Sequence, residues 1–348
     1  MSMSRKRSTL SDVARIAGVS LTTASMGLAD NPRVAVATKQ KVRSAAERLG
    51  YVPHSAGRAL RMQRVGAIAV VVPHGTHHVF SHPVLMSLLE GIISVANQHD
   101  LMTILSTALS DEDEESAYHH ITRGRRADGV IVAAAAAADT HPMQLARSGY
   151  PITVIGKTRL MSDVSTVGID DHGGAYRATR HLIEAHGAKR IAHISGPLGH
   201  QSAIDKREGY MAALAEAGLA VDPRLQYEGD YGESSGVEAA RAFLPVIGSF
   251  DALFSGNDQM ALGALQVFRA AGVEVPSDLL MVGYDDHPLV RYTRPSLTTV
   301  AADMVHVGVI AAQTLIAKLN GPSASATHTT LPTELVLRAS CGCTTEPS

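Results

Sequence analysis

Residues 9–28 read TLSDVARIAGVSLTTASMGL, and this stretch predicts two short helices joined by a tight turn. Apolar residues recur at helical spacing between Leu10 and Ala17, and Thr9 before them is suited to cap a helix. Residues 18–20, Gly-Val-Ser, supply a glycine for the turn and a serine to cap the second helix. Two short helices joined by a three-residue turn that contains glycine form a helix-turn-helix.

The second helix of such a motif lies in the major groove of DNA, so its outward face is expected to touch base edges. Its span is expected to be 21–28, with a third helix over about 36–49 closed by Gly50. The spacing predicts six buried apolar residues: Val13, Ala14, Ala17, Val19, Ala24 and Leu28. It leaves three side chains of the second helix facing outward: Leu21, Thr22 and Met26.

Charge is unevenly distributed along the chain. Residues 1–64 contain 12 Lys/Arg and 3 Asp/Glu, a net charge of +9, whereas the remaining 284 residues carry a net charge of −11. A basic head on an acidic body is typical of a nucleic-acid-binding module attached to another domain.

Beyond residue 64, strand-like and helix-like segments alternate. Strands are expected at about 65–72, 101–107, 129–133, 151–155, 190–195, 225–229, 251–255 and 279–284. Helices are expected at about 83–98, 111–124, 140–148, 173–186, 202–217, 234–244 and 257–271. This order predicts two α/β halves with parallel sheets that divide at about 157–165 and leave a ligand-binding cleft between them. The last stretch, with a strand near 297–300, a helix near 303–319 and a strand near 330–337, is expected to cross back between the halves.

Length and composition exclude several classes of protein. The 348 residues are 45% hydrophobic and 18% charged, which indicates two or three folded domains. The longest apolar run, 130–138, is too short to span a membrane, and the N-terminus resembles no secretory signal, so a cytoplasmic protein is expected. The two cysteines, Cys341 and Cys343, fall in a polar tail and cannot form a four-ligand zinc site by themselves.

Two patterns suggest enzymatic or metal chemistry, and the sequence supports neither strongly. Residues 232–236, Gly-Glu-Ser-Ser-Gly, fit the nucleophile-elbow spacing, which would make Ser234 the nucleophile of a serine hydrolase. Such short patterns arise often by chance, so hydrolysis remains a minor alternative and the chain is expected not to be an enzyme. His74, His77, His78 and His82 crowd one loop without a strong metal-binding spacing, so no metal or cofactor is expected.

Several motifs together resemble the LacI/GalR family of bacterial transcription regulators. They are Thr9–Ala14, Ala17–Ser20, Thr23–Ser25, Asn31–Val34, Leu49–Pro53, Ile194–Pro197, Asn257–Ala264 and Val282–Asp286. The resemblance covers nearly the whole chain. It implies an all-α helix-turn-helix headpiece, a hinge helix and a periplasmic-binding-protein-like α/β effector domain of two parallel-sheet subdomains that dimerises.

The expected boundaries follow from these motifs. The headpiece covers 1–52, the hinge helix and linker 53–64, the effector and dimerisation domain 65–340, and the tail 341–348. Within the effector domain, the first subdomain is expected at about 65–164 and 295–325, and the second at about 166–292 and 326–340.

The resemblance also implies positions that contact DNA. Leu21, Thr22 and Met26 match residues that touch base edges, whereas Ser20, Ser25 and Arg33 match residues that meet phosphates or neighbouring bases. Leu60 matches the hinge residue that wedges into the minor groove, where it would kink the duplex. Met26 departs from the Arg of many relatives and cannot form a bidentate contact with guanine, so the familiar operator sequence cannot be transferred.

In the cleft, the resemblance implies that Tyr231 stacks on an effector ring and that Asn257 and Asp285 hydrogen-bond to it. Lys206 stands where the family usually has an Arg that anchors the ligand. The anchoring group is therefore a compact ammonium and not a planar guanidinium that can form two parallel hydrogen bonds. His74, at a strand end, is a further effector-contact candidate. Two structural alternatives stay open, because Asn257 could simply cap the following helix and Asp285 could hold a loop.

The sequence thus predicts a homodimeric repressor of a near-palindromic operator, controlled by a small molecule, with a sugar or related metabolite as the expected effector. A nucleobase- or nucleoside-responsive regulator of the same family is the alternative effector class. A sugar-binding transport protein would share the body of the fold, but it would need a secretion signal and would lack the helix-turn-helix.

Overall fold

The computed structural model describes residues 8–51, 64–110, 113–156, 162–321 and 325–343, and they form two compact units divided at Gly66. The expected hinge helix, with Leu60, and residues 344–348 of the expected tail lie outside the described residues. No helix in these ranges is long and apolar enough to cross a membrane.

The first unit is a bundle of three helices, α1 (Leu10–Ala17), α2 (Leu21–Leu28) and α3 (Val36–Leu49). Its core is formed by small apolar residues from all three helices: Val13, Ala14, Ala24, Val42, Ala45 and Ala46. The other residues expected to be buried, Ala17, Val19 and Leu28, pack around this core. The apolar spacing of residues 10–28 therefore identified the inner face of the bundle.

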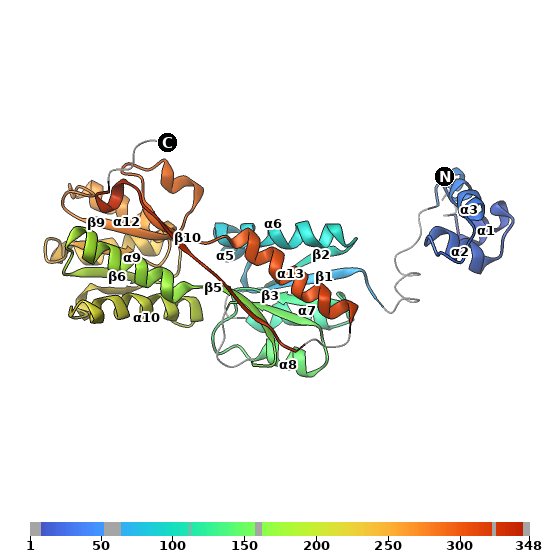
Figure 1. Cartoon of the computed structure of the whole chain (residues 1–348), viewed down its shortest axis with the longest axis horizontal. Helices are drawn as coiled ribbons and strands as arrows, with labels where there is room; N and C mark the ends of the chain where they lie inside the picture. The colour runs from blue at the N-terminus through green and yellow to red at the C-terminus, as the bar shows by residue number, and fades with distance from the viewer. Residues whose placement is uncertain (1–7, 52–63, 111–112, 157–161, 322–324, 344–348) are drawn as a thin grey trace, which may run out of the picture. The chain divides into compact units, whose positions relative to one another are not determined.

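The second unit contains two subdomains, each built on a six-stranded sheet (Figure 1). The first sheet is parallel throughout, with the strand order β11-β5-β4-β3-β1-β2. Its strands are β1 (Ala67–Gly75), β2 (Met102–Ala108), β3 (Gly129–Val132), β4 (Ile152–Ile155), β5 (Ser165–Ile169) and β11 (His328–Leu331). The helices of this subdomain are α5 (Thr76–Ser81), α6 (Pro83–Gln98), α7 (Glu114–Thr122), α8 (His141–Arg147) and α13 (Met304–Asn320).

The second sheet has the order β12-β10-β9-β8-β6-β7 and is parallel except for the β10–β12 pair at its edge. Its strands are β6 (Ile191–Ser195), β7 (Gln226–Glu228), β8 (Ala252–Ser255), β9 (Leu280–Asp285), β10 (Thr298–Ala301) and β12 (Glu334–Val336). The helices are α9 (Asp171–His186), α10 (Gln201–Glu216), α11 (Glu233–Phe243) and α12 (Asp258–Ala270). Short 3-10 turns are η1 (Pro223–Leu225), η2 (Leu244–Val246), η3 (Pro288–Arg291) and η4 (Ala339–Cys341).

Helices cover both faces of the first sheet because alternate residues of β1 point to opposite sides. Ile68, Val70 and Val72 pack in one cluster with residues of α6 and α13, whereas Ala69 and Val71 pack in another with residues of α7. The continuous burial of β1 agrees with the parallel sheet expected from the sequence.

The chain passes between the subdomains three times, after β5, after β10 and after β11.

The structure corrects the sequence assignment of three strands. The strand at 298–301, expected in the first subdomain, pairs with β9 in the second sheet. The single strand expected near 330–337 is two strands in two sheets, and β5 was not expected at all. A pattern of apolar residues identifies a strand but does not identify its pairing partner, which lies far away in the chain.

Helices α6 and α13 cross in direct backbone contact because each has a glycine at the crossing. A Cβ atom on Gly91 would lie 2.0 Å from the carbonyl oxygen of Val305, and one on Gly308 would lie 2.3 Å from that of Leu88. These distances are far below van der Waals contact, so only glycine permits this approach.

We expect Gly91→Ala to lower the melting temperature by several degrees, because α6 and α13 must separate to admit the methyl group. Overpacking of this kind costs about 1–3 kcal/mol, which exceeds the gain in helix propensity of about 1 kcal/mol. Gly199→Ala is the control, since its added Cβ would meet no atom within 4 Å. Equal melting temperatures of the two variants in calorimetry would contradict the close crossing.

Candidate functional site

The helix-turn-helix is fixed by caps at both ends of its turn. The Thr9 hydroxyl and the Asp12 carboxylate form a capping box at the start of α1. Gly18 ends α1 with a φ of 66°, in the left-handed region that favours glycine. The Ser20 hydroxyl then accepts a hydrogen bond of 3.1 Å from the Thr23 backbone nitrogen and caps α2. The turn that was expected from residues 18–20 is therefore present.

The candidate DNA-contacting residues differ in how far they are exposed to solvent. Leu21 is 53% exposed at the start of α2, and Thr22, Arg33 and the capping Ser20 are exposed as well. Met26 is half-buried, and Ser25 is buried in the headpiece. The outward face of α2 is thus formed mainly by its first turn.

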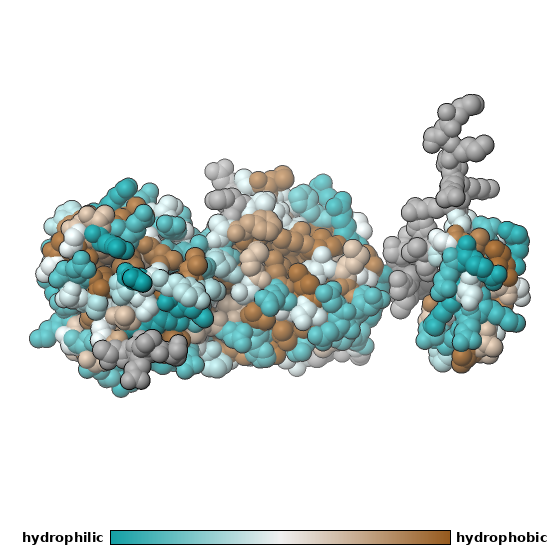
Figure 2. All heavy atoms as spheres, turned by 90° about the horizontal axis from the view of Figure 1, so that it is seen from above, coloured by the Kyte–Doolittle hydropathy of each residue, from teal (hydrophilic) through white to brown (hydrophobic). Residues whose placement is uncertain are grey.

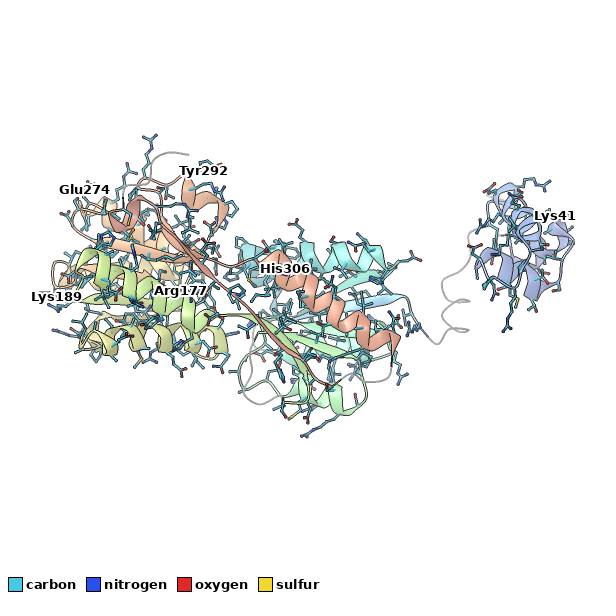
Figure 3. All side chains as sticks on the ribbon, viewed as in Figure 1. Lys41, Arg177, Lys189, Glu274, Tyr292 and His306 are labelled. Atoms are coloured by element: carbon cyan, nitrogen blue, oxygen red, sulfur yellow. The ribbon has the colours of Figure 1, made fainter. Side chains whose placement is uncertain are left out.

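Part of the positive charge of the headpiece is paired within the headpiece itself. Lys39 Nζ lies 3.0 Å and Arg43 Nη2 2.9 Å from Asp30 Oδ1. The hydrogen bond and charge of Lys39, followed by the charge of Arg43, lower the pKa of Asp30. Lys41, between these two residues, is exposed on α3 (Figure 3). Exposed cations such as Lys41 and Arg33 leave a surface suited to a polyanion.

A cavity of about 190 Å³ lies between the two subdomains of the second unit. Parallel α/β sheets bind ligands at the carboxyl ends of their strands, and the cavity walls include residues that follow β4, β5, β6 and β8 and the last residue of β9. Four of the five candidate effector residues line it: Lys206, Tyr231, Asn257 and Asp285.

Lys206, on α10, is the only lysine or arginine among the cavity-lining residues and is buried. Its Nζ donates a hydrogen bond of 3.0 Å to the Gly256 carbonyl and lies 3.7 Å from Asp171 Oδ1 and 3.9 Å from Asp285 Oδ1. It also sits 3.8 Å from the centre of the Tyr284 ring, within cation–π range. Burial alone would lower the pKa of Lys206, but the two carboxylates raise it, so the ammonium stays charged.

Asp285 ends β9 and brings a carboxylate to the cavity. Burial raises its pKa to about 6, even though the charge of Lys206 acts in the opposite direction. Asp258 lies behind it and is held by Thr299 Oγ1 at 2.7 Å and the His287 backbone nitrogen at 2.7 Å. Burial, followed by the charge of Asp285, raises the pKa of Asp258 well above its usual value. Carboxylates crowded in this way favour a ligand that donates hydrogen bonds.

Tyr231 and Asn257 form one connected wall. The Asn257 Nδ2 donates to the Tyr231 carbonyl at 2.8 Å, and its Oδ1 accepts from the Met260 backbone nitrogen at 2.9 Å. Asn257 therefore caps α12, which was the structural alternative given for it from the sequence. It also positions Tyr231. The Tyr231 hydroxyl lies 3.1 Å from Ser202 Oγ.

Three cavity residues other than glycine have positive φ angles: 57° at Ala134, 69° at Tyr231 and 102° at Asp285. L residues rarely adopt this conformation, and it persists only where the surroundings impose it. Two of these three strained positions present the aromatic ring and the carboxylate of the cavity.

The opposite wall, from the first subdomain, is mostly apolar. Its main residues are Val84, Leu85, Leu88, Ile155, Ile169, Met304 and Val307. His74, the fifth candidate, is not among the lining residues. It is buried behind the cavity, where its Nε2 lies 2.8 Å from the Ala134 carbonyl oxygen and its ring stacks on His200, which does line the cavity.

Most lining residues were not among the effector candidates from the sequence, and three polar ones are Asp171, His200 and Gln259. Asp171 follows β5, a strand that its β-branched residues Thr166, Val167 and Ile169 could have revealed. Gln259 joins the two subdomains, because its Nε2 donates to the Ser81 carbonyl at 2.9 Å and its Oε1 lies 3.1 Å from His82 Nδ1. Ala137 N also donates to Gly199 O across the cleft at 2.8 Å.

Ser234, the candidate nucleophile of the minor hydrolase alternative, is exposed in the first turn of α11. The neighbouring Ser235 is buried, and its hydroxyl lies 3.1 Å from the Asp230 backbone nitrogen and 3.0 Å from the Gly232 carbonyl oxygen. The Gly-Glu-Ser-Ser-Gly pattern therefore forms a helix start beside the cavity wall.

Family models match both units of the chain. Residues 9–54 match "Bacterial regulatory proteins, lacI family", and residues 179–341 match a "Periplasmic binding protein-like domain". Among solved structures, the lac repressor dimer bound to operator and the anti-inducer ONPF is 26% identical, with a TM-score of 0.85 over 97% of this chain and 99% of that chain. A transcriptional regulator CelR–cellobiose complex is 32% identical, with a TM-score of 0.75 over 96% of this chain and all of that chain.

Full-length relatives agree with these matches. The transcriptional regulator CelR of Thermobifida fusca is 33% identical over 338 residues, covering 97% of this chain and 99% of CelR. Catabolite control protein A of Priestia megaterium is 32% identical, covering 95% of this chain and 98% of that protein. These relatives are transcription regulators rather than enzymes. The chain belongs to the lacI family of bacterial regulatory proteins, which are DNA-binding regulators of transcription.

Proposed function

We propose that the protein is a repressor whose affinity for operator DNA is controlled by a sugar or closely related polyol bound in the cavity between the subdomains. The observation that carries the effector class is the buried group of Lys206, Asp171 and Asp285, which faces an apolar wall. Carboxylates accept hydrogen bonds from hydroxyl groups, while the apolar wall and the Tyr231 ring suit the C–H face of a sugar ring.

The CelR–cellobiose complex supports this class of ligand, because it shows a sugar bound to a protein that shares the fold and 32% of the sequence. A nucleoside, the alternative effector, would also offer donors and a ring for Tyr231. A thermal-shift screen with cellobiose, monosaccharides and nucleosides distinguishes the two classes, because only a bound ligand stabilises the folded cavity. Stabilisation by nucleosides alone would contradict the sugar proposal.

Control of DNA binding is proposed to act through the angle between the subdomains. The cavity walls include Ile169, Asp171 and Met304, at or beside two of the three connections between the subdomains. A ligand that binds one angle more tightly shifts the equilibrium toward that angle. Measuring operator affinity with and without the stabilising ligand tests this coupling, and equal affinities would contradict it.

We propose that the protein acts in the cytoplasm, since operator DNA is its partner. The proposed assembly is a homodimer. Apolar side chains gather on the surface of the first subdomain (Figure 2). Exposed apolar residues of α5, α6, β2 and the residue after β2 include Phe80, Ile93, Met102 and Leu109. Such a patch supports a protein interface. Light scattering on the wild type and on Ile93→Arg tests it, with dimer expected for the first and a shift toward monomer for the second.

Met26 is proposed to set base preference rather than overall affinity, because it is uncharged and lies on α2. We expect Met26→Arg to shift preference toward guanine at one position of each half-site, by about 1–3 kcal/mol. Selection from a randomised operator library measures this preference. Gln40→Arg, which adds the same charge on an exposed position of α3, should strengthen binding without changing the preferred sequence. An unchanged preference for Met26→Arg would place α2 away from the bases.

Asp285 is proposed to accept hydrogen bonds from the effector. Asp285→Asn keeps the shape and removes the charge, so we expect about 10- to 100-fold weaker effector binding, as for the loss of one charge-assisted bond. Operator binding without effector should stay near the wild-type value. Glu274→Gln, which alters an exposed carboxylate (Figure 3), is the matched control. Calorimetric titration with the stabilising sugar measures both variants, and wild-type affinity in Asp285→Asn would remove this residue from the site.

The affinity for the effector should also depend on pH. Because the pKa of Asp285 is raised to about 6, the carboxylate is ionised above that pH and protonated below it. We expect affinity to be constant above about pH 7 and to fall as the pH decreases through 6. Asp285→Asn should remove this dependence. A pH profile that is the same in wild type and variant would assign the titration to another group.

A further inference from the structure

Four side chains with metal-binding atoms meet at the end of the chain, away from the effector cavity. His181 and His186 lie on the last turns of α9, whereas Cys341 ends η4 and Cys343 follows two residues later. They form the only group of this kind among the residues that the structure describes. They also include both cysteines of the protein. Cys341 is completely buried, so it lies in the fold and not in the polar tail expected from the sequence.

Three of the four ligand atoms lie at the distances of a tetrahedral zinc site, and the fourth lies close to them. The Nε2 atoms of His181 and His186 are 3.2 Å apart, and Cys343 Sγ lies 3.5 Å and 3.4 Å from them. One ligand atom of each of the four residues lies within 4.8 Å of the others. Nitrogen atoms about 2.05 Å and sulfur atoms about 2.3 Å from a tetrahedral Zn²⁺ lie roughly 3.3–3.8 Å from one another. The group therefore needs only small adjustments to surround an ion.

We propose that His181, His186, Cys341 and Cys343 bind one Zn²⁺ ion that fastens the C-terminal segment to α9. Two thiolates and two imidazoles are a ligand set that closed, structural zinc sites use. Oxygen-preferring cations such as Mg²⁺ and Ca²⁺ find no carboxylate in this group.

The backbone of α9 and that of the C-terminal segment both bring their two ligands close together. His181 and His186 are separated by four residues, within the range found for zinc-binding histidine pairs. The two cysteines are separated only by Gly342, whose φ of 87° is in the left-handed region. This turn brings both sulfur atoms to the same side. A Cβ on Gly342 would lie 3.5 Å from His186 Nδ1, so the turn packs against the histidine ring.

A hydroxyl group also contacts one of the two sulfur atoms. Thr298 Oγ1 donates a hydrogen bond of 3.1 Å to Cys341 Sγ, where it would support a thiolate that binds the ion. Two thiolates at close range repel each other, and a Zn²⁺ ion between them would remove this repulsion.

The position of the site indicates a structural role. Ser340, beside the cysteines, is buried, and its hydroxyl donates to the Met281 carbonyl at 2.7 Å and accepts from the Thr298 backbone nitrogen at 2.8 Å. These bonds attach the segment to β9 and β10. The metal would also link this segment to α9 through coordination bonds to His181 and His186.

The test uses the full-length protein without an affinity tag, because the chain has 17 histidines and a tag would add more. The protein is stripped with a chelator under reducing conditions and then titrated with ZnCl₂. We expect one equivalent of zinc per chain by mass spectrometry and a rise in melting temperature on the order of 5 °C. Replacement by Co²⁺ should give the visible bands of a tetrahedral ion and a near-ultraviolet thiolate-to-cobalt charge-transfer band.

Variants separate this site from other histidines. Cys343→Ser and His181→Gln alter half-buried ligands and should lose the bound zinc, the charge-transfer band and the thermal shift. His306→Gln, an exposed histidine of α13 (Figure 3), should keep all three. Circular dichroism verifies that each variant folds, and His186→Gln replaces any that does not. Zinc binding that persists in the ligand variants, or a cobalt spectrum without a charge-transfer band, would overturn the proposal.

Discussion

The buried ammonium group of Lys206 is the charge on which the architecture of the cavity depends. A cation taken out of water is costly unless opposite charges and hydrogen-bond acceptors surround it. Its partners come from separate parts of the chain: Asp171 begins α9 after the first crossing, Asp285 ends β9, and Gly256 follows β8. The α9, β8 and β9 regions of the second subdomain must therefore come together before the charge is satisfied.

The same requirement explains why the sequence revealed some features of the site and not others. Helix spacing and caps are local, so residues 9–28 predicted the helix-turn-helix and its inner face, including Val13 and Ala24. Asp285 and Tyr231 could be singled out only by resemblance to a family. Asp171 escaped notice because β5 was not recognised, and no local pattern tells which sheet a strand such as β10 joins. Pairing between distant strands is a property of the whole fold.

The histidine and cysteine group illustrates the same limit more sharply. Cys341 and Cys343 lie at least 155 residues from the two histidines in the sequence, so no spacing rule connects them. A polar composition after Leu337 suggested a polar tail, but Ser340 and Cys341 are buried, and the Ser340 hydroxyl is hydrogen-bonded to β9 and β10. Composition describes the average environment of a segment. It does not report the few polar side chains that have partners inside the fold.

The crowding of carboxylates around one ammonium also explains how a small molecule could act on the whole protein. Asp285 has a pKa raised to about 6 by burial, and Asp258 behind it is shifted in the same direction. Asp171 and Asp285 share the ammonium of Lys206, and Asp285 at the cavity wall can also accept hydrogen bonds from a ligand with hydroxyl groups. Such a ligand gains most where the walls are close enough for the carboxylates and the apolar residues to contact it together. Its binding energy therefore differs between subdomain angles, and this difference is the only source from which an effector can shift a conformational equilibrium.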